Sequence, residues 1–241
     1  MIGAHGPAGG CDGERRRLEG IYARYAASPA RRRRWSAANP GNIAIRDELV
    51  AAVWRLAGAE LAAAGAVLDI GCGGGWWLAR LAADPRCHAG LHGVDMLAGR
   101  VAAARAAVPE ARIADGDAGA LPFPAARFDV VTMFTVLSSL PDAAAAHDAV
   151  AEARRVLAPG GVLLLWEPRL PNPGNRATIV ISRGLLKRAL TGTAVQTQTT
   201  TLVPAVARRL GRHTERWYPR LTRLPALRTH RLTCARAPVA R

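Results

Sequence analysis

Short apolar runs alternate with longer segments of helical spacing through the middle of the chain. Each run has the length of a β-strand. Strands are expected at 67–70, 91–94, 111–114, 128–133 and 162–166. Alternation of strands with helices implies right-handed crossovers and a parallel sheet whose ligand binds at the carboxyl ends of the strands. The pattern therefore predicts an α/β fold with a doubly wound, mostly parallel sheet.

The segment before the first strand has helical periodicity. Apolar residues at helical spacing predict a helix over 14–27. A turn with the sequence Asn-Pro-Gly-Asn at 39–42 precedes a second helix, expected over 43–64. Residues 1–13 are rich in glycine and are expected to be disordered. We interpret 14–64 as a helical cap.

The segment after the fifth strand departs from simple alternation. Residues 169–200 are expected to form an inserted lid, and the domain that carries it is placed at 65–241. The elements expected here are a helix over 177–190, a helix over 202–210 and a last strand over 228–236. The lid repeats Asn-Pro-Gly-Asn at 172–175. The repeat is either chance, because both copies are good turn sequences, or a shared functional feature.

The first predicted strand runs into a glycine-rich turn. Gly71, Gly73 and Gly75 follow it, and only glycine permits so tight a turn of backbone against a ligand. The dinucleotide-binding fingerprint requires its third glycine five positions after the first, where Trp76 stands. Asp69 precedes the glycines, and this position suits a ligand with an ammonium group rather than a pyrophosphate. The turn therefore predicts a cofactor site that does not bind a dinucleotide.

Four segments together carry a resemblance to a known family. Asp69–Gly75 resembles motif I of the class I S-adenosylmethionine-dependent methyltransferases. The later segments that resemble this family are 93–96 at the end of the second strand, 116–123, and 155–161 before the fifth strand. The resemblance covers Ala66 to Glu167 and is greatest to small-molecule enzymes of the type 11 group. It implies a Rossmann-like fold whose cap and lid cover the substrate cavity, with S-adenosyl-L-methionine as cofactor.

The resemblance also implies roles for individual residues. Asp95 would bind the ribose diol, since a carboxylate offers two acceptor oxygens to paired hydroxyls. Asp117 and the Ala118 backbone would meet the adenine, and Asp69 would attract the methionine amine. The residues expected to bind the cofactor are Tyr25, Asp69, Gly71, Cys72, Gly73, Gly75, Asp95, Met96, Asp117, Ala118 and Phe134. The alternative interpretation makes the acids strand-end caps or turn formers.

Length and composition agree with one globular enzyme. The chain has 241 residues, and 50% of them are apolar. No apolar run approaches the ~18–20 residues that span a bilayer, and no signal peptide is recognisable. The four cysteines show no metal-ligand spacing, so we expect no metal site and reduced thiols in the cytoplasm.

Positive charge is concentrated at the two ends of the chain, whose formal net charge is +15. Residues 1–36 hold eight basic and three acidic residues, 37–170 hold eleven and fourteen, and 171–241 hold fourteen and one. One interpretation is an arginine-rich solvated surface. The other is an anionic partner: a phosphorylated or otherwise anionic small molecule, a lipid headgroup, or nucleic acid.

Nucleic acid is the less favoured of these partners. No repeat of aromatic and basic residues, of the kind that stacks bases, is visible. Residues 132–135 read Thr-Met-Phe-Thr instead of the Asn/Asp-Pro-Pro-aromatic motif of enzymes that methylate amino groups of bases. The run Arg31–Arg34 is a candidate phosphate-binding patch, but such runs are usually solvated helix ends.

Methyl transfer needs few catalytic groups. An in-line displacement mainly requires an acceptor held about 3 Å from the methyl carbon, and a hydroxyl acceptor gains from a general base. Glu167, at the end of strand five, is our candidate base, and a salt bridge to Arg169 is the alternative role. The further candidates are Ser138, Ser139, His147 and His213. Relatives often carry a His-His pair where the two serines stand, so this chain lacks a histidine base at that spot.

The sequence favours a methyltransferase that uses S-adenosylmethionine for in-line transfer to a small-molecule or lipid-linked natural-product acceptor, anionic acceptors included. An RNA methyltransferase is the first alternative. The second is a regulatory protein that binds S-adenosylmethionine without transferring its methyl group.

Overall fold

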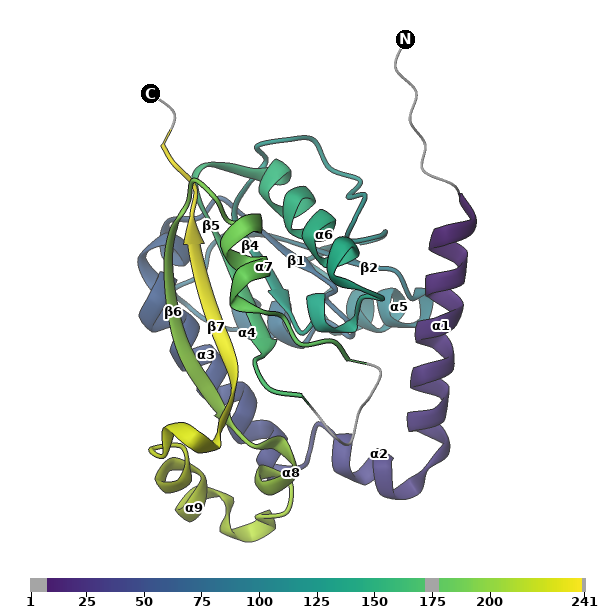
Figure 1. Ribbon diagram of the computed structural model, residues 1–241, viewed down its shortest axis with the longest axis vertical. Helices are drawn as coiled ribbons and strands as arrows, with labels where there is room; N and C mark the ends of the chain where they lie inside the picture. The colour runs from purple at the N-terminus through teal and green to yellow at the C-terminus, as the bar shows by residue number, and fades with distance from the viewer. Residues whose placement is uncertain (1–7, 172–177, 240–241) are drawn as a thin grey trace.

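The sheet predicted from the alternating pattern is present, with seven strands in the order β3-β2-β1-β4-β5-β7-β6 (Figure 1). The computed structural model describes residues 8–171 and 178–239, without side chains for 8–11, 25 and 26. Its strands are β1 (Ala66–Ile70), β2 (Gly90–Asp95), β3 (Arg112–Asp115), β4 (Phe128–Phe134), β5 (Leu157–Pro168), β6 (Ala194–Leu202) and β7 (Arg228–Arg236). β1 to β5 are parallel, and β7 is antiparallel to β5 and β6. The predicted Rossmann-like, mostly parallel α/β fold is confirmed.

The carboxyl ends of the central strands meet along one edge of the sheet, which we call the carboxyl edge. β1 pairs with β2 and β4, so that Ile70 lies beside Val94 and Met133. β2 pairs with β3 as far as Asp95 and Asp115. Because a doubly wound sheet binds ligands outside the carboxyl ends of its strands, this edge is the place to look for a site.

Helices cover both faces of the sheet (Figure 1). α3 (Pro40–Ala63), α4 (Trp76–Ala82) and α5 (Ala98–Ala107) share an apolar cluster on one face. α6 (Ala143–Val156) and α7 (Arg183–Ala189) share a second cluster on the other. The central strands are buried on both sides, which explains why their sequences are apolar runs rather than alternating patterns.

The helix before β1 begins at Pro40, earlier than predicted. Asn39 caps it by accepting from the Gly41 N–H at 2.9 Å, and proline suits the first helical position because no hydrogen bond is lost there. Leu49 and its neighbours on the inner face are fully buried against the sheet. α3 is therefore part of the layered core, which differs from its expected place in the cap 14–64.

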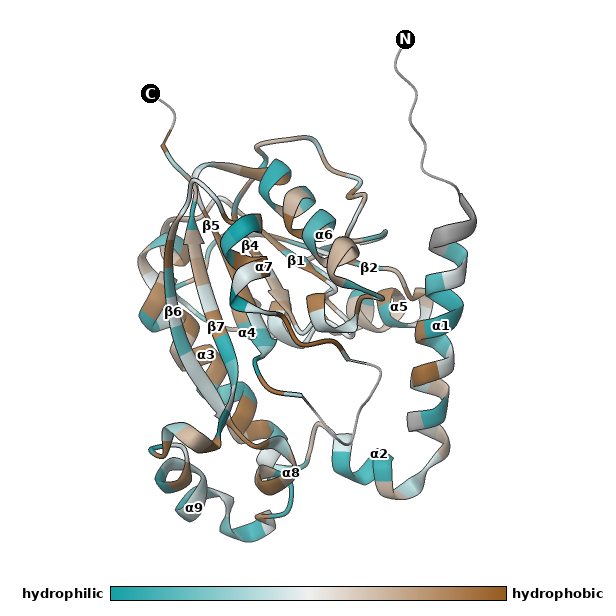
Figure 2. Cartoon of the chain, in the orientation of Figure 1, coloured by the Kyte–Doolittle hydropathy of each residue, from teal (hydrophilic) through white to brown (hydrophobic). Residues whose placement is uncertain are grey.

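The first two helices stand beside the layered core, and the first of them lies next to α5 (Figure 1). α1 (Ala8–Ala27) and α2 (Pro29–Trp35) are hydrophilic over most of their length (Figure 2). Ile21 is the buried apolar residue of α1 among the side chains that the structure describes. Residues 8–13, which we expected to be disordered, belong to this helix, and residues 1–7 lie outside the described part of the chain.

The segment expected as a lid contains an edge strand. β6 pairs with β7 from Ala194 to Leu202, so residues 194–200 of the expected lid belong to the sheet. Between these ends the strand consists mostly of threonine and glutamine, so it lacks the apolar run or the alternation by which a strand is recognised in a sequence. The threonines themselves favour the pleated backbone of a strand. The repeated turn at 172–175 lies outside the described residues.

The last quarter of the chain agrees with the predictions in part. The last strand has the predicted bounds 228–236, and α7 lies inside the helix expected over 177–190. The helix expected over 202–210 is only the short α8 (Pro204–Ala207), and α9 (Thr214–Leu221) was not predicted. The 3-10 turns are η1 (Leu137–Ser139), η2 (Gly211–His213) and η3 (Pro225–Leu227). Within the described ranges, no helix combines the length and apolar character needed to cross a bilayer.

Candidate functional site

The glycine-rich turn has the backbone that its sequence predicts. Gly71, Gly73 and Gly75 have φ angles of 67°, 55° and 79°, in the left-handed region that favours glycine. A Cβ atom at Gly71 would lie 2.6 Å from a methyl carbon of Val136, so no larger residue fits there. The Gly71 N–H donates to the Val94 carbonyl at 2.7 Å, which ties the turn to β2. The turn therefore presents bare backbone at the carboxyl edge.

Asp95 holds this turn and keeps acceptor sites for a ligand. One carboxylate oxygen accepts from the Gly73 N–H at 2.9 Å, and the other from the Leu97 N–H at 3.0 Å. Since a carboxylate has about four lone-pair sites, Asp95 can accept from about two further donors. The side chain is buried at the carboxyl end of β2. Its remaining acceptors fit the two hydroxyls of a ribose.

Asp69 is a second buried carboxylate at the same edge. It accepts from the Thr132 hydroxyl at 2.6 Å. Burial, and to a lesser degree the charge of Asp95, raise the pKa of Asp69 to about 7. Among the residues that the structure describes, neither carboxylate forms an ion pair. Two buried carboxylates without a counter-ion fit a cationic ligand, because each uncompensated charge is costly in a low-dielectric site.

The predicted adenine segment forms a tight turn after β3. Asp117 accepts from the Gly119 N–H at 2.8 Å, so one of its oxygens shapes the turn. Ala118 is half-buried against the apolar cluster beneath α6. Met96, which follows the second strand, is also half-buried. Because β3 neighbours β2, these residues lie on the β2 side of the carboxyl edge.

Three further residues were predicted to bind the cofactor, and their side chains differ in the contacts that they can make. Burial raises the pKa of the Cys72 thiol, so Cys72 contributes backbone and no thiolate. Phe134 ends β4, and its ring meets Trp77 and Trp166 edge-on at centroid distances of 5.3 and 6.4 Å. The side chain of Tyr25 lies outside the described residues. In the described ranges, no three His, Cys, Asp or Glu side chains converge on a possible metal position.

α1 contacts three segments that border the carboxyl edge. Arg15 pairs with Asp115, at the end of β3, at 3.0 Å. Arg17 donates to a backbone carbonyl in η1, the turn that follows β4. The Arg100 guanidinium, on α5, lies 3.8 Å from the centroid of the Tyr22 ring. These contacts hold α1 next to the predicted cofactor residues.

Glu167, the predicted general base, binds backbone groups. Its two oxygens accept from the N–H groups of Leu137 and Ser138 at 2.8 and 3.1 Å. Burial raises the pKa of Glu167 to about 7 against the opposing effect of these hydrogen bonds. The alternative salt bridge is not formed, because the Arg169 guanidinium donates to backbone carbonyls beside β7. Glu167 therefore anchors η1 to the end of β5.

The other base candidates are scattered. Ser138 is buried and its hydroxyl bonds to Glu167. The Ser139 hydroxyl donates to the Thr135 carbonyl at 2.9 Å. His147 and His213 are exposed, and each contacts the side chain next to it in sequence. Of these four candidates, Ser138 is the one that the fold brings to Glu167.

The fold brings together an aromatic pair that the sequence did not reveal. Trp166, near the end of β5, stacks on His230, near the start of β7, with ring centroids 4.5 Å apart and planes 20° apart. Burial lowers the pKa of His230 to about 3, so the imidazole is neutral. Its Nδ1 lies 3.0 Å from the Thr229 hydroxyl. No local pattern marks this histidine, because only the β5–β7 pairing places it at the carboxyl edge.

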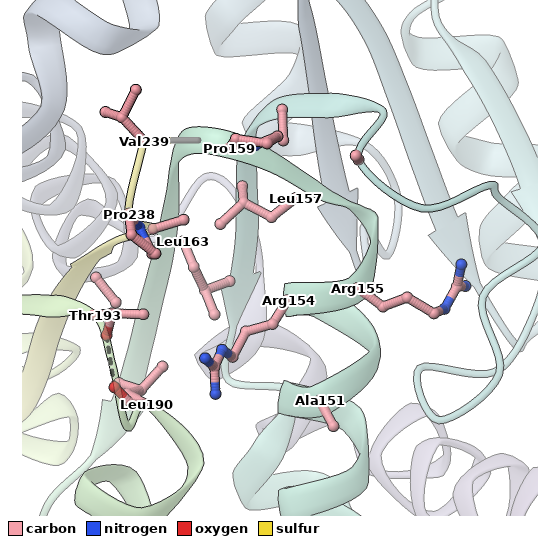
Figure 3. A pocket seen from close by; sticks show the side chains of 14 residues that line it. Ala151, Arg154, Arg155, Leu157, Pro159, Leu163, Leu190, Thr193, Pro238 and Val239 are labelled. Atoms are coloured by element: carbon pink, nitrogen blue, oxygen red, sulfur yellow. Dashed lines mark hydrogen bonds between the residues drawn. The ribbon is translucent and has the colours of Figure 1, made fainter. Parts of the chain in front are cut away.

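A cavity of about 520 Å³ lies at the opposite edge of the sheet, where β5 begins and β7 ends (Figure 3). Arg154 extends into it, but its guanidinium donates to the carbonyls of Ala189 and Thr191. Arg155 points away (Figure 3). Its guanidinium pairs with the Glu152 carboxylate at 2.8 Å. The cavity shares no residue with the predicted cofactor site.

Sequence comparison gives the same assignment as the motifs. A family model described as "Methyltransferase domain" matches residues 67–161. The demethylmenaquinone methyltransferase of Lactiplantibacillus plantarum is 35% identical over an alignment of 128 residues, which covers 49% of this chain and 53% of that protein. The chain thus spans about half the length of this curated relative.

Solved structures share the fold. A [4+2]-cyclase, SpnF, superposes with a TM-score of 0.59 at 21% identity, over 78% of this chain and 81% of the cyclase. An S-adenosylmethionine-dependent methyltransferase from Mesorhizobium loti gives 0.55 at 21% identity, over 77% and 97%. The strand order, the glycine turn and the family match all point to the same kind of domain. Residues 67–161 therefore match a methyltransferase domain in sequence, within a fold that is shared with S-adenosylmethionine-dependent methyltransferases.

Proposed function

We propose that the chain is an S-adenosylmethionine-dependent methyltransferase that acts on a small-molecule or lipid-linked acceptor. The observation that carries the proposal is the pair Asp69 and Asp95, two buried carboxylates beside a turn without side chains. A ligand that carries both positive charge and a ribose would neutralise the pair and use the open acceptors of Asp95. A pyrophosphate would instead add negative charge to it.

Each part of the cofactor has a group to hold it. Asp95 would bind the ribose hydroxyls, and Asp69 would bind the amine of the methionine part, directly or through a water. Asp117 would accept from the adenine amine beside the Ala118 backbone. The cofactor supplies a methyl group that is already activated, so the chain's own residues mainly orient the acceptor and exclude water.

The aromatic side chains near the carboxyl ends of β4 and β5 favour a flat acceptor. Phe134 and the stacked rings of Trp166 and His230 form apolar faces at the carboxyl edge. The neutral imidazole of His230 offers a hydrogen bond rather than a charge. The relative from L. plantarum is named for demethylmenaquinone, and we propose a quinone ring as one flat group to test at the methylated end of the acceptor.

We assign Glu167 a positioning role. Both of its oxygens already accept from the backbone of η1, so its ionised form stabilises the turn that borders the site. The variant Glu167→Gln should slow methyl transfer and still show the fall in rate toward low pH that protonation of a general base produces. Loss of that acidic limb would instead identify Glu167 as the base.

A second candidate is a protein that binds the cofactor without transferring its methyl group. The [4+2]-cyclase shows that this fold also serves a cyclase. In addition, both oxygens of Glu167 accept hydrogen bonds from backbone N–H groups, and the histidines considered as general bases are exposed. Such a protein would bind S-adenosylmethionine and give no methylated product.

The two candidates differ in turnover. The purified protein would be incubated with methyl-labelled S-adenosylmethionine and either demethylmenaquinone or a metabolite extract, and labelled small molecules would be separated by chromatography. We expect labelled product from the wild type and none from Asp95→Asn, whose cofactor affinity should fall at least about tenfold because a charge-assisted contact is lost. Asp148→Asn removes an exposed acid on α6, away from the carboxyl edge, and is the matched control. Tight cofactor binding without product would favour the second candidate.

A further inference from the structure

Arg208 is a half-buried guanidinium without an acidic partner. It follows α8, just beyond the end of β6. Burial lowers the pKa of Arg208 to about 10, and the charge of Arg34 acts in the same direction. Among the described residues, no carboxylate pairs with it. Buried charges normally have a counter-ion, so this one marks a place where an anion would be stabilised.

The guanidinium is held in a fixed orientation. Its central carbon lies 3.8 Å from the centroid of the Trp35 ring, and its Nε donates to the Asn42 side-chain oxygen at 2.7 Å. The Asn42 amide nitrogen donates to the carbonyls of Arg34 and Ser36 at 3.0 and 2.9 Å. Because those two bonds need the nitrogen, the amide oxygen must face Arg208. Stacking and this hydrogen bond thus fix the plane of the group before any ligand binds.

The other end of the guanidinium is open. Only Nε donates to a partner among the described residues, so the N–H groups on the two terminal nitrogens remain. Those groups form the fork that binds a carboxylate or a phosphate through two parallel hydrogen bonds. Because the side chain is already ordered, binding loses little conformational entropy.

Arg208 lies near the aromatic pair on the acceptor side. The preceding residue, Ala207, belongs to an apolar cluster against which Trp166 packs, so Arg208 lies beside the Trp166–His230 stack. In agreement, the Arg208 charge adds to the lowering of the pKa of His230. The predicted cofactor site lies at the carboxyl ends of the central strands, and β4 is three strands from β6 in the sheet, or ~14 Å at the usual strand spacing. An acceptor that reaches from the cofactor to Arg208, beyond the end of β6, is therefore elongated.

We infer that Arg208 binds the carboxylate or phosphate group of the methyl acceptor, at the end of the molecule remote from the atom that is methylated. This inference rests on the proposed function, because it assigns one end of the acceptor of that reaction. It also separates Arg208 from the many solvated arginines of the surface. Arg209, the next residue, is exposed and donates to a carbonyl in its own turn.

Anion binding can be measured without cofactor or turnover. The wild type would be titrated with inorganic phosphate and, separately, with benzoate, in chloride buffer of constant ionic strength, with calorimetry as the readout. We expect saturable one-site binding of at least one anion, and the anion that binds more tightly identifies the group. Arg208→Gln should weaken it at least tenfold, since a charge-assisted bidentate contact is lost. Arg208→Lys keeps the charge without the fork and should bind with intermediate affinity.

Arg209→Gln is the matched control, because it removes the same charge one residue away. It should leave anion affinity within twofold of the wild type. Equal losses in both glutamine variants, unchanged affinity in Arg208→Gln, or no saturable binding by the wild type would each overturn the inference. Thermal melts show whether each variant is folded. If Arg208→Gln is unfolded, the anion affinity of Arg208→Lys tests the inference instead, and an affinity equal to that of the wild type would overturn it. Cofactor affinity, measured in the same variants, should not change, so a failure of the anion site is distinguishable from a failure of the proposed function.

Discussion

At the level of single residues, the site depends on negative charge that the fold leaves uncompensated. Asp69 and Asp95 lie at the carboxyl ends of neighbouring strands, and their only described hydrogen-bond partners are a hydroxyl and backbone N–H groups. The pKa of Asp69 is raised to about 7 because burial disfavours its charge and Asp95 adds repulsion. Glycine at position 71 lets a ligand approach the same place, since a side chain there would collide with Val136.

The affinity for S-adenosylmethionine should rise with pH between about 5.5 and 7. Below its raised pKa of about 7, Asp69 holds a proton that a cationic ligand must displace. Each unit by which the pH falls below that pKa therefore lowers the affinity by up to about tenfold. Calorimetry at pH 6 in two buffers with different ionisation heats should show release of a proton on binding. Asp69→Asn should bind more weakly and release none, whereas Asp148→Asn, an exposed acid on α6, should behave like the wild type. Equal heats in the two buffers would contradict the assignment of positive charge to this place.

At the level of secondary-structure elements, burial separates the fixed parts from those that can move. α3 buries a continuous apolar face against the sheet, including Leu49, Val53 and Leu61. α1 buries far less and is held mainly by polar contacts, such as the exposed pair Arg15–Asp115. Surface ion pairs of this kind contribute about 0–1 kcal/mol each. We therefore propose that α1 is the mobile lid of the site.

Hydrogen exchange should show this difference directly. Amides in 12–24 should exchange faster than those in 45–61, because opening α1 breaks few apolar contacts. Saturating S-adenosylmethionine should slow exchange in 12–24 and leave 45–61 unchanged. In Asp115→Ala, which removes the partner of Arg15, α1 should exchange faster still without cofactor. Equal protection of both helices in the free protein would mean that α1 is part of the rigid fold.

At the level of the whole molecule, the charge distribution decides which partners are attracted. The chain has a formal net charge of +15, and Arg31–Arg34 are exposed on α2. Such a surface attracts polyanions through counter-ion release, and this attraction carries no sequence or substrate specificity. The ordered, unpaired Arg208 is a different kind of feature from these solvated side chains.

Nucleic acid should bind to the purified protein at low salt and dissociate as salt rises. We expect retention near 50 mM salt and loss near 500 mM, because several phosphate contacts give a steep salt dependence. Removal of the nucleic acid should leave the incorporation of labelled methyl groups into small molecules unchanged. Label in the macromolecular fraction that nuclease releases would instead establish an RNA acceptor.

The sequence anticipated those parts of the fold that depend on local chemistry. The apolar runs located β1, β2, β4 and β5, because strands buried on both faces are largely apolar. β3 was located as well, although this edge strand buries only Ile113. The start of α3 was predicted too late, because the residues 39–42 were interpreted as a turn although Asn39 caps the helix and Pro40 fits its first position. β6 was missed because an edge strand rich in threonine and glutamine lacks that signal. The roles of α3 and of residues 194–200 were misjudged, because periodicity shows a helix or a strand and not what covers it.

Local sequence was sufficient to predict the parallel strands, the glycine turn and the acids at the strand ends, because each depends on neighbours a few residues away. The three-dimensional fold was needed to show that Glu167 binds the backbone of η1, that His230 stacks on Trp166, and that Arg208 meets Trp35 and Asn42. These contacts join residues more than 25 positions apart. The physical reason is that the pKa, orientation and partners of a side chain follow from burial and strand pairing, which no local pattern encodes.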